Sequence, residues 1–126
     1  MVGLAVVSHS ETAAEGIAEV ASEMAGDTRI EPVGGDGQGG FGTVADDIEA
    51  AIERADDGDG VVVLVDLGSA VMNAEVATEV SDVETAIADA PVLEGAVNAA
   101  VAATSASATV ESVREQAEAA RGVEKL

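Results

Sequence analysis

Short apolar runs alternate along this chain with longer segments that have a helical period. Residues 2–8 and 61–65 are the most continuous apolar runs, as expected for strands covered on both faces of a sheet. Residues 28–33 and 85–90 are shorter and more polar, and we predict strands there too. Segment 28–33 is polar enough to lie at an edge of the sheet.

Apolar residues between and after these strands recur at steps of three and four, which is the period of an amphipathic helix. We predict helices over 11–25, 44–53, 69–80, 93–104 and 109–121. The first is expected to bury Ile17, Val20, Ala21 and Met24, and the fourth Ala96, Val97, Ala100 and Val101. In the third, Met72, Val76 and Val80 share one face.

Polar residues that suit helix starts stand before several of these segments. Thr12 with Glu15 is a candidate capping box for the first helix, in which each side chain satisfies a free backbone N–H. Thr43 and Thr109 are candidate N-caps of later helices.

The predicted order of elements is β-α-β-α-β-α-β-α-α. Strands that alternate with helices indicate an α/β fold of three layers, with a mostly parallel four-stranded sheet and right-handed crossovers. A chain of 126 residues suits one domain with one core, so we expect residues 1–126 to form a single domain.

Composition indicates which side chains build the core and where in the cell the protein is expected. Hydrophobic residues make up 48% of the chain, and Phe41 is its only aromatic residue, so the core must be built from small aliphatic side chains. The chain has no cysteine, which excludes disulfides and thiolate chemistry. No apolar run approaches the roughly 18 residues of a membrane span, and no signal peptide is visible, so we expect a cytoplasmic protein.

Acidic residues dominate the charged positions. The chain has 25 Asp and Glu against 5 Lys and Arg, a formal net charge of −20. Such a surface repels nucleic acid and anionic membranes, so we expect neither as a partner. Because the acids are spread over every predicted helix, we interpret the charge as adaptation to a salt-rich, halophilic cytoplasm, in which ions screen the self-repulsion.

His9, the only histidine, follows the first predicted strand, and Asp66 follows the third. The first and third strands of such sheets are commonly neighbours, so we expect these side chains to meet at the carboxyl edge, where open α/β sheets bind ligands. Asp66 would fix the tautomer of His9 and leave the other ring nitrogen as a nucleophile. Small donors for a phosphate stand nearby at Ser8, Ser10, Gly68 and Ser69, the last two at a helix start.

Other chemistries find little support in the sequence. One histidine among scattered carboxylates has no zinc spacing, so we expect no metal, and no serine hydrolase motif is present. Residues 37–42 match G-x-G-x-x-G, but they follow the second strand, so a mobile loop is the better interpretation of the glycine-rich segment 34–42 than a dinucleotide site. A bare anion-binding pocket, with Asp66 merely ending a strand, stays open.

Five stretches in order resemble the DhaM family, the phosphotransfer subunits of phosphoenolpyruvate-dependent dihydroxyacetone kinases, whose first domain is similar to mannose-type EIIA proteins of the sugar phosphotransferase system (PTS). The stretches are Val6–Ser10, Gly42–Thr43, Asp66–Ala70, Asn73–Glu75 and Ala90–Gly95. The resemblance implies a phosphotransferase subunit that acts in glycerone and glycerol metabolism. It also implies a homodimer without a cofactor.

The resemblance further implies roles for single residues and partners. His9 would carry the phosphoryl group on Nε2, Asp66 would hold Nδ1, and Ser69 would contact the phosphoryl oxygens. The donor would be HPr, charged by enzyme I, and the acceptor would be ADP held in the DhaL subunit, which serves dihydroxyacetone bound in DhaK. Longer members append HPr-like and enzyme-I-like domains, so this chain is expected to rely on separate proteins for both.

Two alternatives stay open. A sugar-specific mannose-type EIIA protein would pass its phosphate to an EIIB transporter component, although Asp66–Ala70 and Leu93–Gly95 look more like the kinase branch. A non-catalytic regulator or nucleotide-binding module is the other alternative, and tight nucleotide binding by the isolated chain would favour it.

The charge generates a first prediction. Lowering the salt concentration from molar to dilute buffer should loosen the fold, because the repulsion among the surplus acids is then less screened. Circular dichroism across a salt titration is the measurement. A spectrum that stays unchanged down to dilute buffer would contradict salt adaptation.

Overall fold

The computed structural model describes all 126 residues and contains a four-stranded sheet in the order β2-β1-β3-β4, with all three strand pairs parallel. The elements in chain order are β1 (Gly3–Ser8), α1 (Glu11–Ser22), β2 (Ile30–Gly34), α2 (Ala45–Ala55), β3 (Val61–Val65), α3 (Gly68–Val80), β4 (Thr85–Ala88), α4 (Val92–Ala103), α5 (Val110–Glu118) and the 3₁₀ turn η1 (Ala119–Gly122). The predicted α/β class, the order of elements and the edge position of the second strand are confirmed.

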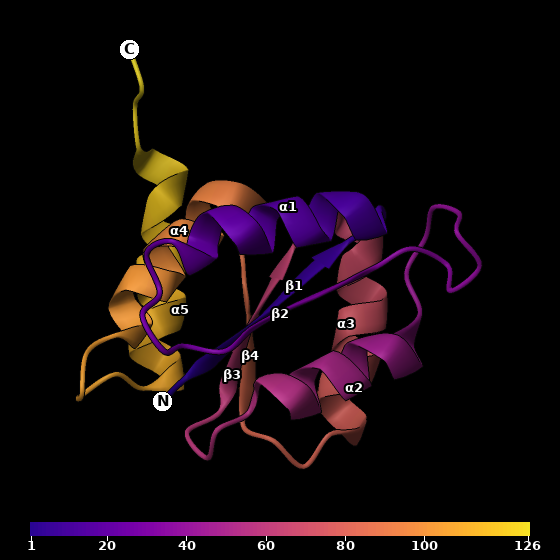
Figure 1. The fold of residues 1–126 in the computed structure, drawn as a ribbon, viewed down its shortest axis with the longest axis horizontal. Helices are drawn as coiled ribbons and strands as arrows, with labels where there is room; N and C mark the ends of the chain where they lie inside the picture. The colour runs from indigo at the N-terminus through magenta and orange to yellow at the C-terminus, as the bar shows by residue number, and fades with distance from the viewer.

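Helices cover both faces of the sheet and so form the outer two of three layers (Figure 1). Helices α1, α4 and α5 lie on one face, and α2 and α3 lie on the other. Side chains of β1 and β3 alternate between the two cores, because successive residues of a strand point to opposite faces. Leu4 and Leu64, for example, enter the first core, while Val7 and Val63 enter the second.

The two central strands bring the candidate site together through their register. Val7 of β1 pairs with Val65 of β3, so the residues that follow each of them, Ser8 and Asp66, emerge side by side. The backbone N–H of Asp66 donates to the carbonyl of Val7 at 3.1 Å, which extends the ladder by one more bond. The prediction that the first and third strands are neighbours in the sheet is therefore confirmed.

Small residues, rather than the larger ones expected, form the buried faces of three helices. Helix α1 buries Ala14, Ala18 and Ala21, whereas Val20 and Met24 are exposed, so the predicted face was wrong for those two. Helix α3 buries Ala70, Ala74 and Ala77, and the face that Met72, Val76 and Val80 share is turned to solvent. Helix α4 buries Ala96 and Ala100 as predicted, but it exposes Val101.

Close packing explains this preference for alanine. At Gly95 of α4, for example, an added Cβ would lie 2.9 Å from the Cβ of Ala90 and 3.3 Å from Leu64. Layers that approach so closely leave no room for even a methyl group at Gly95 and favour alanine at the neighbouring buried positions, and the larger side chains of the same helices lie outside the contact. Hydrophobic periodicity identifies a helix, but it does not tell how closely that helix packs against the sheet.

Two of the three predicted helix caps differ in the structure. Ser10, not Thr12, caps α1, because its hydroxyl accepts a hydrogen bond from the N–H of Ala13 at 3.2 Å. Val44 is the N-cap of α2 and has no side-chain cap, since Thr43 is used elsewhere. Thr109 caps α5 as predicted, in a reciprocal capping box with Ser112.

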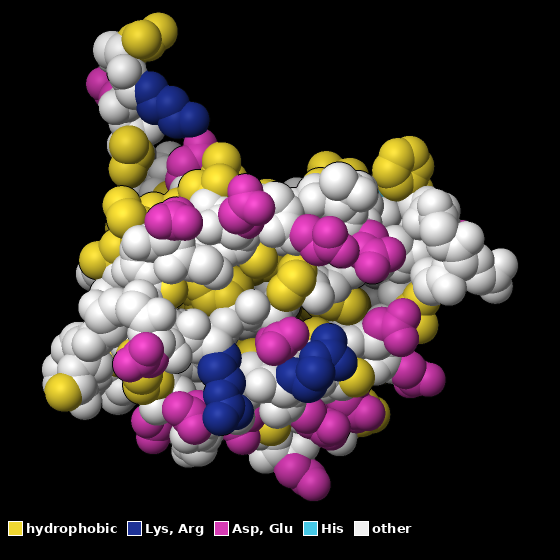
Figure 2. Space-filling model, in the orientation of Figure 1, with side chains coloured by type: hydrophobic (Ala, Val, Ile, Leu, Met, Phe, Trp, Pro, Cys, Tyr) yellow, Lys and Arg dark blue, Asp and Glu magenta, His cyan; other side chains and the backbone are white.

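Acidic side chains are spread over the face shown in Figure 2, with only a few lysine and arginine groups among them. Each of the five basic residues forms an ion pair with a carboxylate: Arg29 with Asp57, Arg54 with Glu31, Arg114 with Glu111 and Glu118, Arg121 with Asp89, and Lys125 with Glu94. None of the helices is both long and apolar enough to cross a membrane.

Candidate active site

The candidate site lies at the carboxyl ends of β1 and β3. His9 directly follows β1, and Asp66 lies between the end of β3 and the start of α3. The side chains of His9 and Asp66 are 24% and 20% exposed, so the pair is partly sheltered but open to a reactant. The structure thus brings together the two residues that the sequence predicted to meet.

Asp66 accepts four hydrogen bonds, two at each carboxylate oxygen. Oδ1 accepts from Nδ1 of His9 at 3.0 Å and from the N–H of Leu67 at 2.7 Å. Oδ2 accepts from the hydroxyl of Ser8 at 2.8 Å and from the N–H of His9 at 3.0 Å. The carboxylate is therefore not a free strand end: it holds both the backbone and the ring of His9.

These hydrogen bonds favour the ionised form of Asp66. Partial burial raises the pKa of Asp66, but the hydrogen bonds from the backbone and ring of His9, from Ser8 and from Leu67 outweigh it, so the pKa lies below its usual value. The contribution of Asp66 to stability is therefore fully present above the ordinary aspartate pKa of about 3.9 and is lost as the pH falls through the lowered value.

The ionised carboxylate decides which nitrogen of His9 carries the proton. A carboxylate only accepts, so Nδ1 of His9 must donate to Oδ1 of Asp66. In the neutral ring Nε2 then bears a lone pair, and it accepts from the hydroxyl of Ser69 at 2.7 Å. Nε2 is thus the ring nitrogen whose lone pair could act as a nucleophile, and Ser69 lies within hydrogen-bond distance of it.

The two serines that flank His9 in the sequence, Ser8 and Ser10, form hydrogen bonds with protein groups other than Nε2. The hydroxyl of Ser8 is buried, donates to Asp66 and accepts from the N–H of Ser10 at 3.0 Å. The hydroxyl of Ser10 caps α1. Both hydroxyls are used within the protein, so their direct effect in this geometry is to fix Asp66 and the turn that carries His9.

The start of α3 supplies further donors beside Nε2. The first N–H groups of a helix have no partner within it, and those of Gly68 and Ser69 stand in this position. A Cβ added at Gly68 would meet no atom within 4 Å, so the space above this turn is open. A cavity of about 460 Å³ adjoins it, lined in part by Asp66, Leu67 and Gly68. The arrangement suits an anion on Nε2.

One contact was missed by reasoning from the sequence. The side-chain amide of Asn73 donates to the hydroxyl of Thr43 at 2.6 Å and to its carbonyl at 3.2 Å, which ties α3 to the segment before α2. Both residues lie in the stretches that carry the family resemblance, and that was the only available signal. The structure contains no group of three or more His, Cys, Asp or Glu side chains placed to hold a metal ion.

Comparison with known proteins shows the family to which the chain belongs. Residues 3–114 match the EIIA-man family, described as the PTS system fructose IIA component. The chain is 42% identical over 106 residues to a DhaM subunit of a PEP-dependent dihydroxyacetone kinase from Listeria innocua, covering 80% of this chain and 85% of the relative. It is 37% identical over 116 residues to DhaM of Lactococcus lactis, a PTS-dependent kinase subunit, covering 92% and 93% of the two chains.

A solved structure has the same fold. The crystal structure of EF1359, described as a protein of unknown function, superimposes with a TM-score of 0.83 at 28% identity and covers 99% of this chain and 98% of its own. The chain therefore belongs to the EIIA-man family and to the family of DhaM subunits.

The hydrogen bonds of the site predict the tautomer of His9. At a pH where the ring is neutral, ¹⁵N NMR should find the proton on Nδ1, because Asp66 holds it there. Asp66→Ala removes that acceptor, and the proton should move mostly to Nε2. Glu75→Ala, which removes a nearby acid without a hydrogen bond to His9, is the matched control. A wild-type ring protonated on Nε2 would contradict the assigned geometry.

Proposed function

We propose that this protein is a phosphohistidine carrier of a PTS-dependent dihydroxyacetone kinase. It accepts a phosphoryl group from phospho-HPr on His9 and passes it to ADP bound in the DhaL subunit, whose ATP then serves dihydroxyacetone in DhaK. The observation that carries the proposal is the pair of contacts on the ring: Nδ1 is held by Asp66, and Nε2 points its lone pair toward Ser69 at the start of α3.

The two transfers balance without a cofactor. In the first, the N–P bond of the donor's phosphohistidine breaks as a bond forms between phosphorus and Nε2 of His9, while the proton on Nδ1 stays with the hydrogen bond to Asp66. In the second, the Nε2–P bond breaks and a terminal phosphate oxygen of ADP takes the phosphoryl group. His9 returns to its neutral form, so the chain acts as a covalent intermediate of a phosphotransferase.

The four predicted phosphate-binding residues divide into two kinds in this proposal. The Ser69 hydroxyl turns from Nε2 to a phosphoryl oxygen, and the N–H groups of Gly68 and Ser69 donate to the remaining oxygens. Ser8 and Ser10 act on the phosphate through the groups they hold, because their hydroxyls already bond to Asp66 and to α1.

The kinase is favoured over a sugar transporter as the destination of the phosphoryl group. The two relatives described above are named as subunits of dihydroxyacetone kinases, and they match 80% and 92% of this chain. A mannose-type EIIA protein that serves an EIIB component has the same chemistry at His9, so the acceptor distinguishes the two. We place the reaction in the cytoplasm of a halophilic cell, where an acidic protein and its partners work at high salt.

We also propose a homodimer that uses the β4 edge of the sheet. β4 is an edge strand, and an uncovered edge offers unpaired backbone groups to a second chain. The exposed face of α3 beside it carries Val76 and Val80, which are apolar. An apolar helix face next to an open strand edge fits a second copy of the same surface.

Labelling tests the carrier role directly. Incubation with phosphoenolpyruvate, enzyme I and HPr should place one phosphoryl group on the protein, and the bond should be acid-labile and alkali-stable, as expected for phosphohistidine. His9 is the only histidine, so His9→Ala should take none. A chase with ADP-loaded DhaL should move the label to ATP. A His9→Ala variant that is still labelled would exclude the mechanism, and transfer only to an EIIB protein would favour the transporter.

The dimer is tested by changing its apolar face. Val80→Arg should shift the protein from dimer to monomer in analytical ultracentrifugation at high salt, because it places an unpaired charge in the contact. Val101→Arg on α4 is the control, since this side chain is exposed to a similar degree on the other face of the sheet. A wild-type monomer, or a dimer insensitive to Val80→Arg, would contradict this contact.

A further inference from the structure

Phe41 is the only aromatic residue of the chain, and the structure exposes it rather than burying it. Its side chain is 83% exposed, and the hydrophobic core is built from aliphatic residues alone. It lies in the glycine-rich segment 34–42, for which the carrier chemistry itself supplies no role. Figure 1 shows that this segment, between β2 and α2, projects beyond the helices and strands.

Hydrogen bonds within the glycine-rich segment define its conformation in the structure. The side-chain Oδ1 of Asp36 accepts hydrogen bonds from the N–H of Gln38 at 2.8 Å and from the N–H of Gly40 at 2.9 Å. The backbone N–H of Asp36 donates to the carbonyl of Gly40 at 3.0 Å. Gly37 and Gly39 have φ values of 82° and 86°, a region that favours glycine. These bonds lower the pKa of Asp36, led by the one from Gly40, so the carboxylate stays ionised and keeps accepting.

Both ends of the segment are fastened to the active site. At its start, a Cβ on Gly34 would lie 2.5 Å from the carbonyl oxygen of Ser8, so β2 packs directly against the turn that carries His9. At its end, the N–H of Gly42 donates to the carbonyl of His9 at 2.9 Å, and Thr43 is held by Asn73. Phe41 is therefore presented one residue away from a hydrogen bond to His9.

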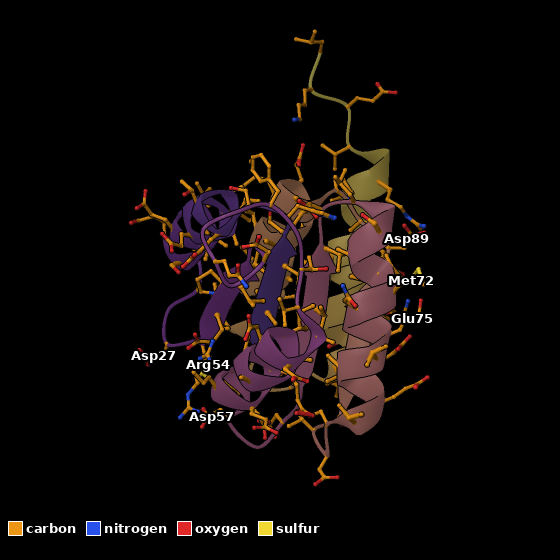
Figure 3. The ribbon with its side chains drawn as sticks, turned by 90° about the vertical axis from the view of Figure 1, so that its right-hand side faces the viewer. Asp27, Arg54, Asp57, Met72, Glu75 and Asp89 are labelled. Atoms are coloured by element: carbon orange, nitrogen blue, oxygen red, sulfur yellow. The ribbon has the colours of Figure 1, made fainter.

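Two more exposed apolar side chains stand on the α3 side of His9. Leu67 is 60% exposed and Met72 is 73% exposed. Met72 lies three residues after Ser69, so the two are neighbours on the first turns of α3, and Ser69 bonds to Nε2 of His9. Met72 is at the N-terminal end of the exposed face of α3, whereas the proposed dimer contact uses Val76 and Val80 toward its C-terminal end. Figure 3 shows Met72 on the outward side of α3, near Glu75 and Asp89. We call Phe41, Leu67 and Met72 the apolar rim, because they lie on the two segments that hydrogen-bond to His9: Phe41 precedes Gly42, and Leu67 and Met72 lie on either side of Ser69 in the chain.

We propose that the apolar rim is the docking surface for the protein that donates the phosphoryl group, with Phe41 as its anchor; this inference rests on the proposed function. His9 is only 24% exposed, so a donor that carries its phosphoryl group on a side chain must bring its surface onto the residues around His9. Aromatic residues, phenylalanine included, are enriched in protein interfaces, where a few large side chains usually carry most of the affinity.

The charge of the chain also favours apolar contact. A net charge of −20 repels other acidic proteins, and salt high enough to screen that repulsion also removes electrostatic steering over longer distances. Short-range apolar burial is not weakened in this way. The donor surface that fits is therefore an apolar patch around its phosphohistidine with a recess for one phenyl ring.

Two phosphoryl donors separate docking from chemistry. Phospho-HPr must dock, whereas phosphoramidate is a small molecule that reaches Nε2 without touching Phe41. Phe41→Ala should lower kcat/KM for phospho-HPr by at least about 10-fold, mainly through KM, and leave the phosphoramidate rate unchanged. Met24→Ala, which removes an apolar side chain 54% exposed at the far end of α1, should leave both rates unchanged. Phe41→Leu should restore part of the loss.

Each contrary result has a separate meaning. A Phe41→Ala protein that reacts with phospho-HPr within twofold of the wild type would overturn the docking proposal, and so would an equal loss with both donors. A defect confined to transfer from phosphorylated protein to ADP-loaded DhaL would assign the rim to the acceptor instead and overturn the choice of donor. A wild type labelled by phosphoramidate but not by phospho-HPr would contradict the proposed function itself, together with this partner.

Discussion

The site depends on the hydrogen bonds that the carboxylate of Asp66 accepts. It accepts hydrogen bonds from the ring and backbone of His9, from Ser8 and from Leu67, and so binds the end of one central strand to the end of the other. None of these contacts is local in sequence except the one to Leu67, so the site exists only when β1 and β3 pair in the observed register. The orientation of the His9 ring therefore depends on correct pairing of the two central strands.

In the proposed function, the site would hold a doubly charged phosphoryl group without a basic side chain. Each lysine and arginine is paired with a carboxylate, and none bonds to His9, Asp66 or Ser69. The charge of a phosphoryl group on Nε2 would instead be met by a hydroxyl and by N–H groups at the start of α3. A negative charge at a helix N-terminus gains about 0.3–2 kcal/mol from the helix dipole, without forming an ion pair. A carrier benefits from such moderate binding, because the group it accepts must also leave.

The sequence predicted the architecture and the central pair of residues, but not the details of packing. Continuous apolar strands and helical periods identified the sheet, and adjacency of the first and third strands then brought His9 to Asp66. Periodicity failed for Val20 and Met24, because it reports which residues share a face and not how closely two layers approach. The caps at Ser10 and Val44 and the contact between Asn73 and Thr43 depend on tertiary geometry, which a local pattern does not contain.

A core made almost entirely of alanine and valine has a thermal consequence. Few large side chains are buried, and the one aromatic ring lies in solvent, so unfolding uncovers comparatively little apolar surface for each residue. The heat capacity of unfolding follows that surface, and a small value flattens the curve of stability against temperature. The small side chains of the core should thus make the free energy of unfolding change little with temperature, on warming and on cooling alike.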